Sequence, residues 1–252
     1  MTPIEAAGGG SLQKAENGER MAANPRSAPP LHHQHVYRFA PTPEHRAERL
    51  FVFLHGAGAD AHSLIPAAFK FQARFPSAAL VLPEGIERCE ADATRQQWFS
   101  TRGLNDDNRL ARVKQILPDV EYLVRREQAT HRVDAERTVL IGFSQGGTVA
   151  LEAIKAFPGL ANAVVAFSAR FARLPVSGSH IPARIHLVHG EYDAIVSRVH
   201  SERAARVLSA LHVPCTLDVI GDLGHALSHH AISIGSLRLL QGIFEGRRAT
   251  LH

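Results

Sequence analysis

The sequence predicts a single-domain α/β fold in which a mostly parallel sheet is covered by helices on both faces. Short apolar segments, such as RLFVFLH over residues 49–55, run without polar interruption, as strands buried on both faces require. Longer segments with apolar residues at helical spacing lie between them, and this alternation is typical of parallel sheets. At 252 residues the chain is long enough for one such domain.

Apolar patterning locates the individual elements. The expected strands cover residues 35–40, 49–55, 78–83, 137–143, 162–168, 184–190 and 214–220, of which the first is expected at the sheet edge. The expected helices cover residues 62–75, 105–124, about 146–157, 197–212 and 226–244. An Asp or Asn among residues 105–107 is expected to cap the second helix, and Pro118 is expected to bend it.

The N-terminal segment differs from the rest of the chain. Residues 1–34 are rich in Gly, Ala, Pro and polar groups without apolar periodicity, so we expect a disordered tail before a folded domain over residues 35–252. Met21 is an alternative translation start that the sequence leaves open. The histidines of LHHQH (residues 31–35) are expected to bind nothing specific in such a segment, and no metal site is expected.

Composition excludes several classes of protein. No apolar run approaches the roughly 20 residues of a membrane-spanning helix, and the N-terminus lacks a signal-peptide pattern, so we expect a cytoplasmic protein without stable membrane insertion. Cys89 and Cys215 match no metal spacing and are expected to be reduced thiols. The net charge of +4 comes from scattered arginines without interleaved aromatic residues, so no nucleic-acid partner is expected. A homodimer is left open.

The segment VLIGFSQGGTVALEAI (residues 139–154) predicts a nucleophile. Its serine, Ser144, lies at a tight turn between a buried strand and a helix, in a Gly-x-Ser-x-Gly context. Gly142 and Gly146 are small enough for strand and helix to approach, and Gly147 continues the crowded turn. Such a corner exposes the hydroxyl and directs the N–H groups of the helix N-terminus toward it.

A serine hydroxyl needs a base, and the base needs an orienting acid. Asp193 follows the strand over residues 184–190, and His225 follows the strand over residues 214–220. Carboxyl ends of parallel strands meet at one edge of a sheet, so both side chains are expected near Ser144. The chain order Ser, Asp, His matches that of α/β hydrolases.

Other titratable residues compete for these roles. Glu191 lies too near its strand end to reach the histidine, and Asp222 would have to bend back from the histidine's own loop. The remaining candidates are histidines: His229 and His230 on the final helix, and His55 and His189, which are expected to make loop hydrogen bonds.

The segment LHGAGAD (residues 54–60) is expected to complete the site. Its glycines allow backbone N–H groups to point inward, so the N–H groups of Ala57 and Gln145 are the expected oxyanion donors. The alternative is a simple glycine-rich turn.

Five motifs occur in a specific order: LHGAGAD, QQWFS, GFSQGG, HGEYD and GHA. The ordered set resembles the bacterial carboxylesterase/phospholipase family of α/β hydrolases, which is related to acyl-protein thioesterases, over about residues 35–245. The resemblance implies a serine hydrolase of small-molecule carboxylic esters or thioesters that needs no cofactor. It implies Ser144, Asp193 and His225 as the catalytic triad.

The same resemblance implies Ala57 and Gln145 as oxyanion donors and Trp98 as a wall of the acyl pocket, with an ordinary core aromatic as the alternative for Trp98. The sequence departs from the family pattern at three places. Ala57 replaces a common leucine, Ser100 stands where an aspartate commonly follows the Trp-Phe pair, and the N-terminal tail is extra.

Residues 169–183 number only 15, too few for a large lid domain. An open groove favours esters of short to medium acyl chains. The alternatives are acyl-protein thioesterase or lysophospholipase activity on longer chains, and a non-catalytic binding module, which would have no chemical need for all three triad residues.

Overall fold

The computed structural model describes residues 35–42 and 45–249. The expected tail over residues 1–34, which includes Met21 and most of the histidine cluster, lies outside these residues. Within them, no helix combines the length and the apolar character that crossing a membrane requires.

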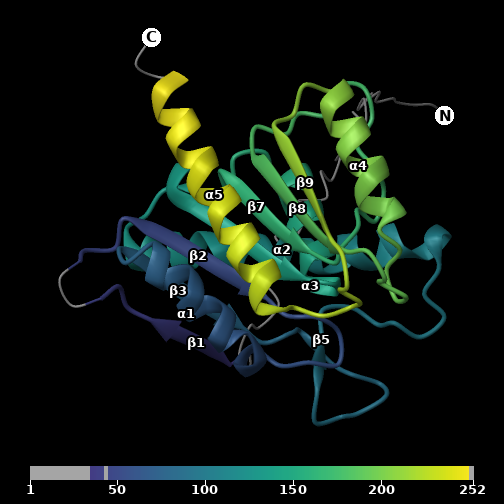
Figure 1. The fold of residues 1–252 in the computed structure, drawn as a ribbon. Coiled ribbons are helices and arrows are strands. Elements are labelled where there is room, and N and C mark those ends of the chain that lie inside the picture. The colour runs from purple at the N-terminus through teal and green to yellow at the C-terminus, as the bar shows by residue number, and fades with distance from the viewer. Residues whose placement is uncertain (1–34, 43–44, 250–252) are drawn as a thin grey trace, which may run out of the picture. The chain divides into compact units, whose positions relative to one another are not determined.

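The structure is built on a seven-stranded sheet with the strand order β1-β3-β2-β6-β7-β8-β9 (Figure 1). In the described part of the chain, β1 pairs antiparallel with β3, and all other pairs of this sheet are parallel. The carboxyl ends of the parallel strands therefore share one edge. The strands are β1 (Val36–Phe39), β2 (Arg49–Leu54), β3 (Ala78–Pro83), β6 (Thr138–Phe143), β7 (Ala163–Phe167), β8 (Arg184–Gly190) and β9 (Cys215–Ile220).

Helices cover both faces of the sheet (Figure 1). They are α1 (Ile65–Arg74), α2 (Asp106–His131), α3 (Gln145–Ala156), α4 (Val199–Ala210) and α5 (His229–Ala249), with short 3-10 turns at Ala61–Leu64 and Ala135–Arg137.

Strand β2 shows how the two faces divide the core. Leu50, Val52 and Leu54 join the cluster that includes side chains of α2, α3 and α4, whereas Phe51 and Phe53 join the cluster of α1 and α5. Alternate side chains of a strand point to opposite faces, so a sheet covered on both sides needs apolar residues at every position. The predicted mostly parallel sheet with helices on both faces is confirmed.

The start of α2 is set by its cap. The side chain of Asn105 accepts hydrogen bonds from the backbone N–H groups of Asp107 and Asn108, each at 3.0 Å, and Asn108 Oδ1 accepts one from Asn105 N at 2.9 Å. This reciprocal pair confirms the predicted cap. The helix continues on both sides of Pro118, and the bend expected there stays a prediction.

The predicted end of α2 is wrong, because the helix continues well beyond residue 124. The added turns are polar, but contacts with distant segments hold them. Glu127, which is fully buried, accepts hydrogen bonds of 2.7 and 2.9 Å from Arg38 of β1, and Gln128 donates one of 2.8 Å to the carbonyl of Leu160. These partners lie far away in the sequence, so no local pattern reveals them.

A second, two-stranded sheet lies in the loop that contains the tryptophan. Strands β4 (Glu87–Arg88) and β5 (Gln96–Gln97) pair antiparallel. The loop is joined to the segment after β2, because Gln96 accepts from Gly58 N at 2.9 Å and donates to Ala59 O at 3.0 Å. Strands of two residues are too short to produce a periodic signal.

His186 on β8 is an unusual buried group. Its side chain is 1% exposed, Nδ1 lies 2.9 Å from Thr216 Oγ1, and Nε2 has no hydrogen-bond partner among the described residues. Burial, with a smaller contribution from the charges of Arg184 and Arg238, lowers the pKa of His186 to about 4.

We therefore predict that His186 weakens the fold in acid. The unfolded chain binds a proton on this residue near pH 6.5 and the folded chain only near pH 4, so stability falls as the pH is lowered through this window, by at most about 3 kcal/mol. Urea unfolding between pH 7 and pH 4.5 should give a shallower pH dependence for His186→Gln than for the wild type.

The exposed His230 provides the matched control, His230→Gln, whose side chain meets solvent in the folded and unfolded chain alike. Equal pH slopes for His186→Gln and the wild type would contradict the prediction.

Candidate active site

Ser144 forms the corner between β6 and α3. Its backbone has φ 53° and ψ −114°, a left-handed conformation that costs a non-glycine residue of order 1–3 kcal/mol. Two hydrogen bonds hold the corner: Ser144 N donates to Phe167 O of β7 at 2.9 Å, and Ser144 O accepts from Thr148 N of α3 at 3.0 Å.

Glycines around this corner are required by close backbone approach. A Cβ atom on Gly146 would lie 2.1 Å from the carbonyl oxygen of Leu54 at the end of β2. One on Gly142 would lie 2.5 Å from the backbone of Gly146, and one on Gly147 would lie 2.5 Å from the Cβ of Ala169. The clearance expected from the sequence is confirmed.

The structure brings Ser144, His225 and Asp193 into one hydrogen-bonded chain. His225 Nε2 lies 3.0 Å from Ser144 Oγ, while His225 Nδ1 lies 2.8 and 3.0 Å from the two carboxylate oxygens of Asp193. The side chain of Asp193 is fully buried, and that of His225 is 18% exposed. The carboxylate fixes the proton of His225 on Nδ1, so Nε2 is free to accept the serine proton.

Asp193 remains ionised although it is buried. Burial alone would raise the pKa of its carboxyl group, but hydrogen bonds from His225 and from the N–H groups of Val196 and Ile195, at 2.8 and 3.0 Å, outweigh burial and hold the pKa below its usual value. The negative charge needed beside the imidazole is therefore present at neutral pH.

A second histidine contacts the same carboxylate. His189 Nε2 lies 2.7 Å from Val196 O and 3.3 Å from Asp193 Oδ2, and its Nδ1 lies 2.8 Å from Ser201 Oγ. Burial lowers the pKa of His189. In the neutral ring, Nε2–H donates toward the two oxygens and Nδ1 accepts from Ser201. The sequence predicted loop hydrogen bonds for His189 but gave no signal of its contact with Asp193.

The competing residues are not part of the hydrogen-bonded set formed by Ser144, His225 and Asp193. Glu191 and Asp222 are exposed, as are His229 and His230 at the start of α5. Among the hydrogen bonds of the described residues, those of the His225 side chain go to Asp193 and Ser144.

The backbone N–H groups of Ala57 and Gln145 are among those near Ser144 that have no protein acceptor in the described part of the chain. Gln145 is the first residue of α3, and Ala57 lies in the loop after β2. This loop passes close to Ser144: a Cβ on Gly56 would lie 3.4 Å from the Cβ of Ser144. The arrangement is suited to an anion that forms next to the serine.

Trp98, the expected wall of the acyl pocket, is buried. Its side chain is 0% exposed and belongs to the core that includes α2 and α3, and its indole N–H donates to His55 O at 2.8 Å. An acyl-pocket wall must present surface to the substrate, and Trp98 presents none in this structure. Its position is that of an ordinary core aromatic, which the sequence analysis gave as the alternative.

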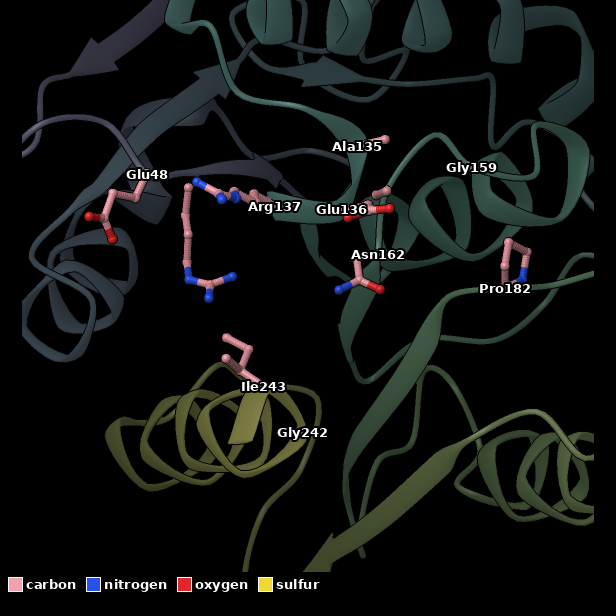
Figure 2. A pocket seen from close by; sticks show the side chains of 11 residues that line it. Glu48, Ala135, Glu136, Arg137, Gly159, Asn162, Pro182, Gly242 and Ile243 are labelled. Carbon is pink, nitrogen blue, oxygen red and sulfur yellow. The ribbon is translucent and has the colours of Figure 1, made fainter. Parts of the chain in front are cut away.

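A cavity of about 830 Å³ lies at the opposite end of the sheet (Figure 2). It is bordered by residues at the amino ends of strands, including Arg137 before β6 and Asn162 before β7, and by Ile243 of α5. Ser144 follows the carboxyl end of β6, so this cavity is not part of the candidate active site.

Comparison with known proteins identifies the family of this chain. Residues 37–234, which include all three members of the hydrogen-bonded chain, match the model of the Phospholipase/Carboxylesterase family. The chain belongs to this family. It is 38% identical to Esterase YpfH from Escherichia coli (strain K12) over 199 residues, which are 79% of this chain and 85% of the relative. Family and relative make it a carboxylic ester hydrolase.

Solved structures of other hydrolases share the fold. Esterase PE8 has a TM-score of 0.76 at 24% identity, with 82% of this chain and 98% of that chain covered. Zea mays acyl-protein thioesterase 2 has a TM-score of 0.66 at 17% identity, with 82% and 98% covered. Both support the α/β-hydrolase fold. Residues 169–183 of this chain form no helix or strand.

The clearance at the corner generates a stability prediction. Gly146→Ala should lower the free energy of unfolding by at least about 2 kcal/mol, because the added methyl group meets backbone atoms that cannot rotate away. Urea unfolding measures the loss. Gly221→Ala is the control, since the nearest atom to its Cβ is 3.7 Å away, at the end of the flexible Glu191 side chain. Equal stability of the two variants would contradict the argument.

Proposed function

We propose that this family member is a serine hydrolase that cleaves carboxylic esters of short to medium acyl chains through an acyl-enzyme on Ser144. The observation that carries the proposal is the hydrogen-bonded chain from Ser144 Oγ through His225 to the buried carboxylate of Asp193. A neutral serine is a poor nucleophile, and this chain supplies the base and the charge that stabilises the base once it is protonated.

In the first half of the reaction, Ser144 Oγ attacks the ester carbonyl while His225 Nε2 takes the serine proton. Asp193 stabilises the resulting imidazolium. His225 then gives the proton to the leaving alcohol, and the carbon–oxygen bond to that alcohol breaks. In the second half, His225 takes a proton from water, the hydroxide attacks the acyl-enzyme, and Ser144 recovers its proton as the carboxylic acid leaves.

The oxyanion of each tetrahedral intermediate is bound by the N–H groups of Ala57 and Gln145. Support for this assignment comes from their lack of protein acceptors among the described residues and from the approach of the Ala57 loop to the serine. Loss of one such donor typically costs about 2.7–4 kcal/mol of transition-state stabilisation.

The proposed substrate is a small-molecule ester with an apolar part. Tyr192 and Ile195, on either side of Asp193 in the sequence, are 68% and 74% exposed and offer apolar surface on the loop that carries this residue. The short segment over residues 169–183 leaves no helical lid to enclose a long chain. The cytoplasm is the proposed location, supported by the two free thiols of Cys89 and Cys215.

Substitution of the nucleophile and the acid tests the proposal. Ser144→Ala should lower kcat for p-nitrophenyl butyrate by more than about 10³-fold and abolish labelling by a fluorophosphonate probe. Asp193→Asn should lower kcat by roughly 10²–10⁴-fold, because it removes the charge opposite the imidazolium. Wild-type protein that neither hydrolyses the ester nor reacts with the probe would instead favour a non-catalytic binding module.

A chain-length series tests the substrate class. We expect p-nitrophenyl butyrate and hexanoate to be hydrolysed with higher kcat/KM than the palmitate ester, because residues 169–183 form no helical lid to enclose a long chain. The matched thioesters, butyryl and palmitoyl, form the second arm, with Ser144→Ala as the background control. Faster cleavage of the palmitoyl thioester than of any oxygen ester would contradict the prediction and favour a protein or lysophospholipid deacylase.

A further inference from the structure

We propose that the side chains of Trp98 and Gln145 together form a brace that fixes the distance between the two oxyanion donors, which makes Trp98 a positioning residue for the transition state. The inference rests on the proposed function and adds two side-chain roles to it.

The two donors come from separate parts of the fold. Ala57 lies in the loop after β2, and Gln145 begins α3 after β6. An oxyanion bound between two N–H groups needs both within about 2.7–3.1 Å of one oxygen position. Something must therefore set the position of the loop relative to the helix. The segment that contacts both is residues 96–99.

The side chain of Gln145, on α3, makes hydrogen bonds to this segment. Its side-chain Oε1 accepts from Trp98 N at 2.8 Å, and its Nε2 donates to Phe99 O at 2.7 Å. The residue is only 8% exposed, so both bonds are shielded from water. Gln145 therefore has two roles: its backbone N–H faces the oxyanion, and its side chain holds residues 96–99.

The side chain of Trp98 makes a hydrogen bond to the loop after β2. Its indole N–H donates to His55 O at 2.8 Å, two residues before Ala57. Gln96 adds backbone hydrogen bonds to Gly58 and Ala59 just beyond Ala57. The loop is therefore held on both sides of its oxyanion donor by one short segment.

The His55 ring stiffens the same loop. Its Nε2 accepts from Gly85 N at 2.8 Å, so the ring proton is on Nδ1 and is donated to Gly56 O at 2.8 Å. His55 is fully buried, and burial lowers its pKa, which keeps the ring neutral and this tautomer in place. The side chain of Trp98 is therefore attached to an ordered loop.

The physical consequence concerns the transition state. Removal of the indole N–H leaves the carbonyl of His55 buried without this partner and frees the loop to shift. A shift of about 1 Å in one donor weakens its bond to the oxyanion, while the uncharged ester in the ground state needs neither donor. Loss of the brace should therefore lower kcat and leave KM nearly unchanged.

Trp98→Phe tests this directly, since it keeps an aromatic ring and removes the N–H donor. With p-nitrophenyl butyrate we expect kcat to fall by about 10- to 100-fold and KM to change by less than about threefold. Gln145→Met, which keeps the chain length but loses both hydrogen bonds, should have a similar effect. The double variant should be less impaired than the product of the two single losses, because both break one brace.

A second measurement separates positioning from general damage to the core. A trifluoromethyl ketone of matched chain length adds Ser144 Oγ to its carbonyl carbon, with the serine proton passing to His225 and the charge to the ketone oxygen. Its inhibition constant should rise in the brace variants by the same factor as kcat/KM falls. Phe71→Leu, in the buried core of α1, should lower stability without this change.

The outcomes distinguish the two proposals. Wild-type kcat and wild-type inhibition by the ketone in folded Gln145→Met or Trp98→Phe would overturn the brace and leave the serine hydrolase intact. If one variant fails to fold, the other decides. Absence of hydrolysis and of ketone binding in the wild type would overturn the proposed function itself.

Discussion

The close approach of α3 to the end of β2 is the constraint on which the site depends. The turn at Ser144 must bring the helix N-terminus within van der Waals distance of the backbone at Leu54, and only a residue without a Cβ fits at Gly146. The same approach forces Ser144 into its left-handed conformation. Because Gln145 is the first residue of α3, its N–H has no intrahelical acceptor. The corner thus places the Ser144 hydroxyl next to a backbone N–H that has no protein acceptor in the described part of the chain.

Three buried carboxylates carry negative charge, and each is compensated by nearby hydrogen-bond donors or cationic side chains. That of Asp193 is surrounded by two imidazoles and two backbone N–H groups. Glu127 is paired with Arg38, and Glu152 with Lys155 at 2.6 Å. Removing a carboxylate from water is costly, and each of these is stable only because several donors replace the solvent. At Asp193 the compensating hydrogen bonds also orient the imidazole of His225.

The two ends of the sheet serve different purposes. At the carboxyl ends, loops after β2, β6, β8 and β9 carry the site, and their backbones are fixed by hydrogen bonds between segments far apart in the sequence. At the amino ends lies the cavity of Figure 2, bordered by side chains of both charges such as Glu136 and Arg137. Parallel strands make this separation automatic, because each strand presents its carboxyl end to the same edge.

The amino-acid sequence by itself determined the sheet, most helix boundaries, and the elements that carry Ser144, Asp193 and His225. These features depend on local apolar patterning, on a glycine-rich corner of a few residues and on the common edge of parallel strands. Only the tertiary structure decided the burial of Trp98, the hydrogen bonds of the Gln145 side chain to residues 98 and 99 and the contact of His189 with Asp193. The physical reason is that contacts of this kind depend on where side chains lie in space, which leaves no periodic signal in the sequence and exists only once the chain is folded.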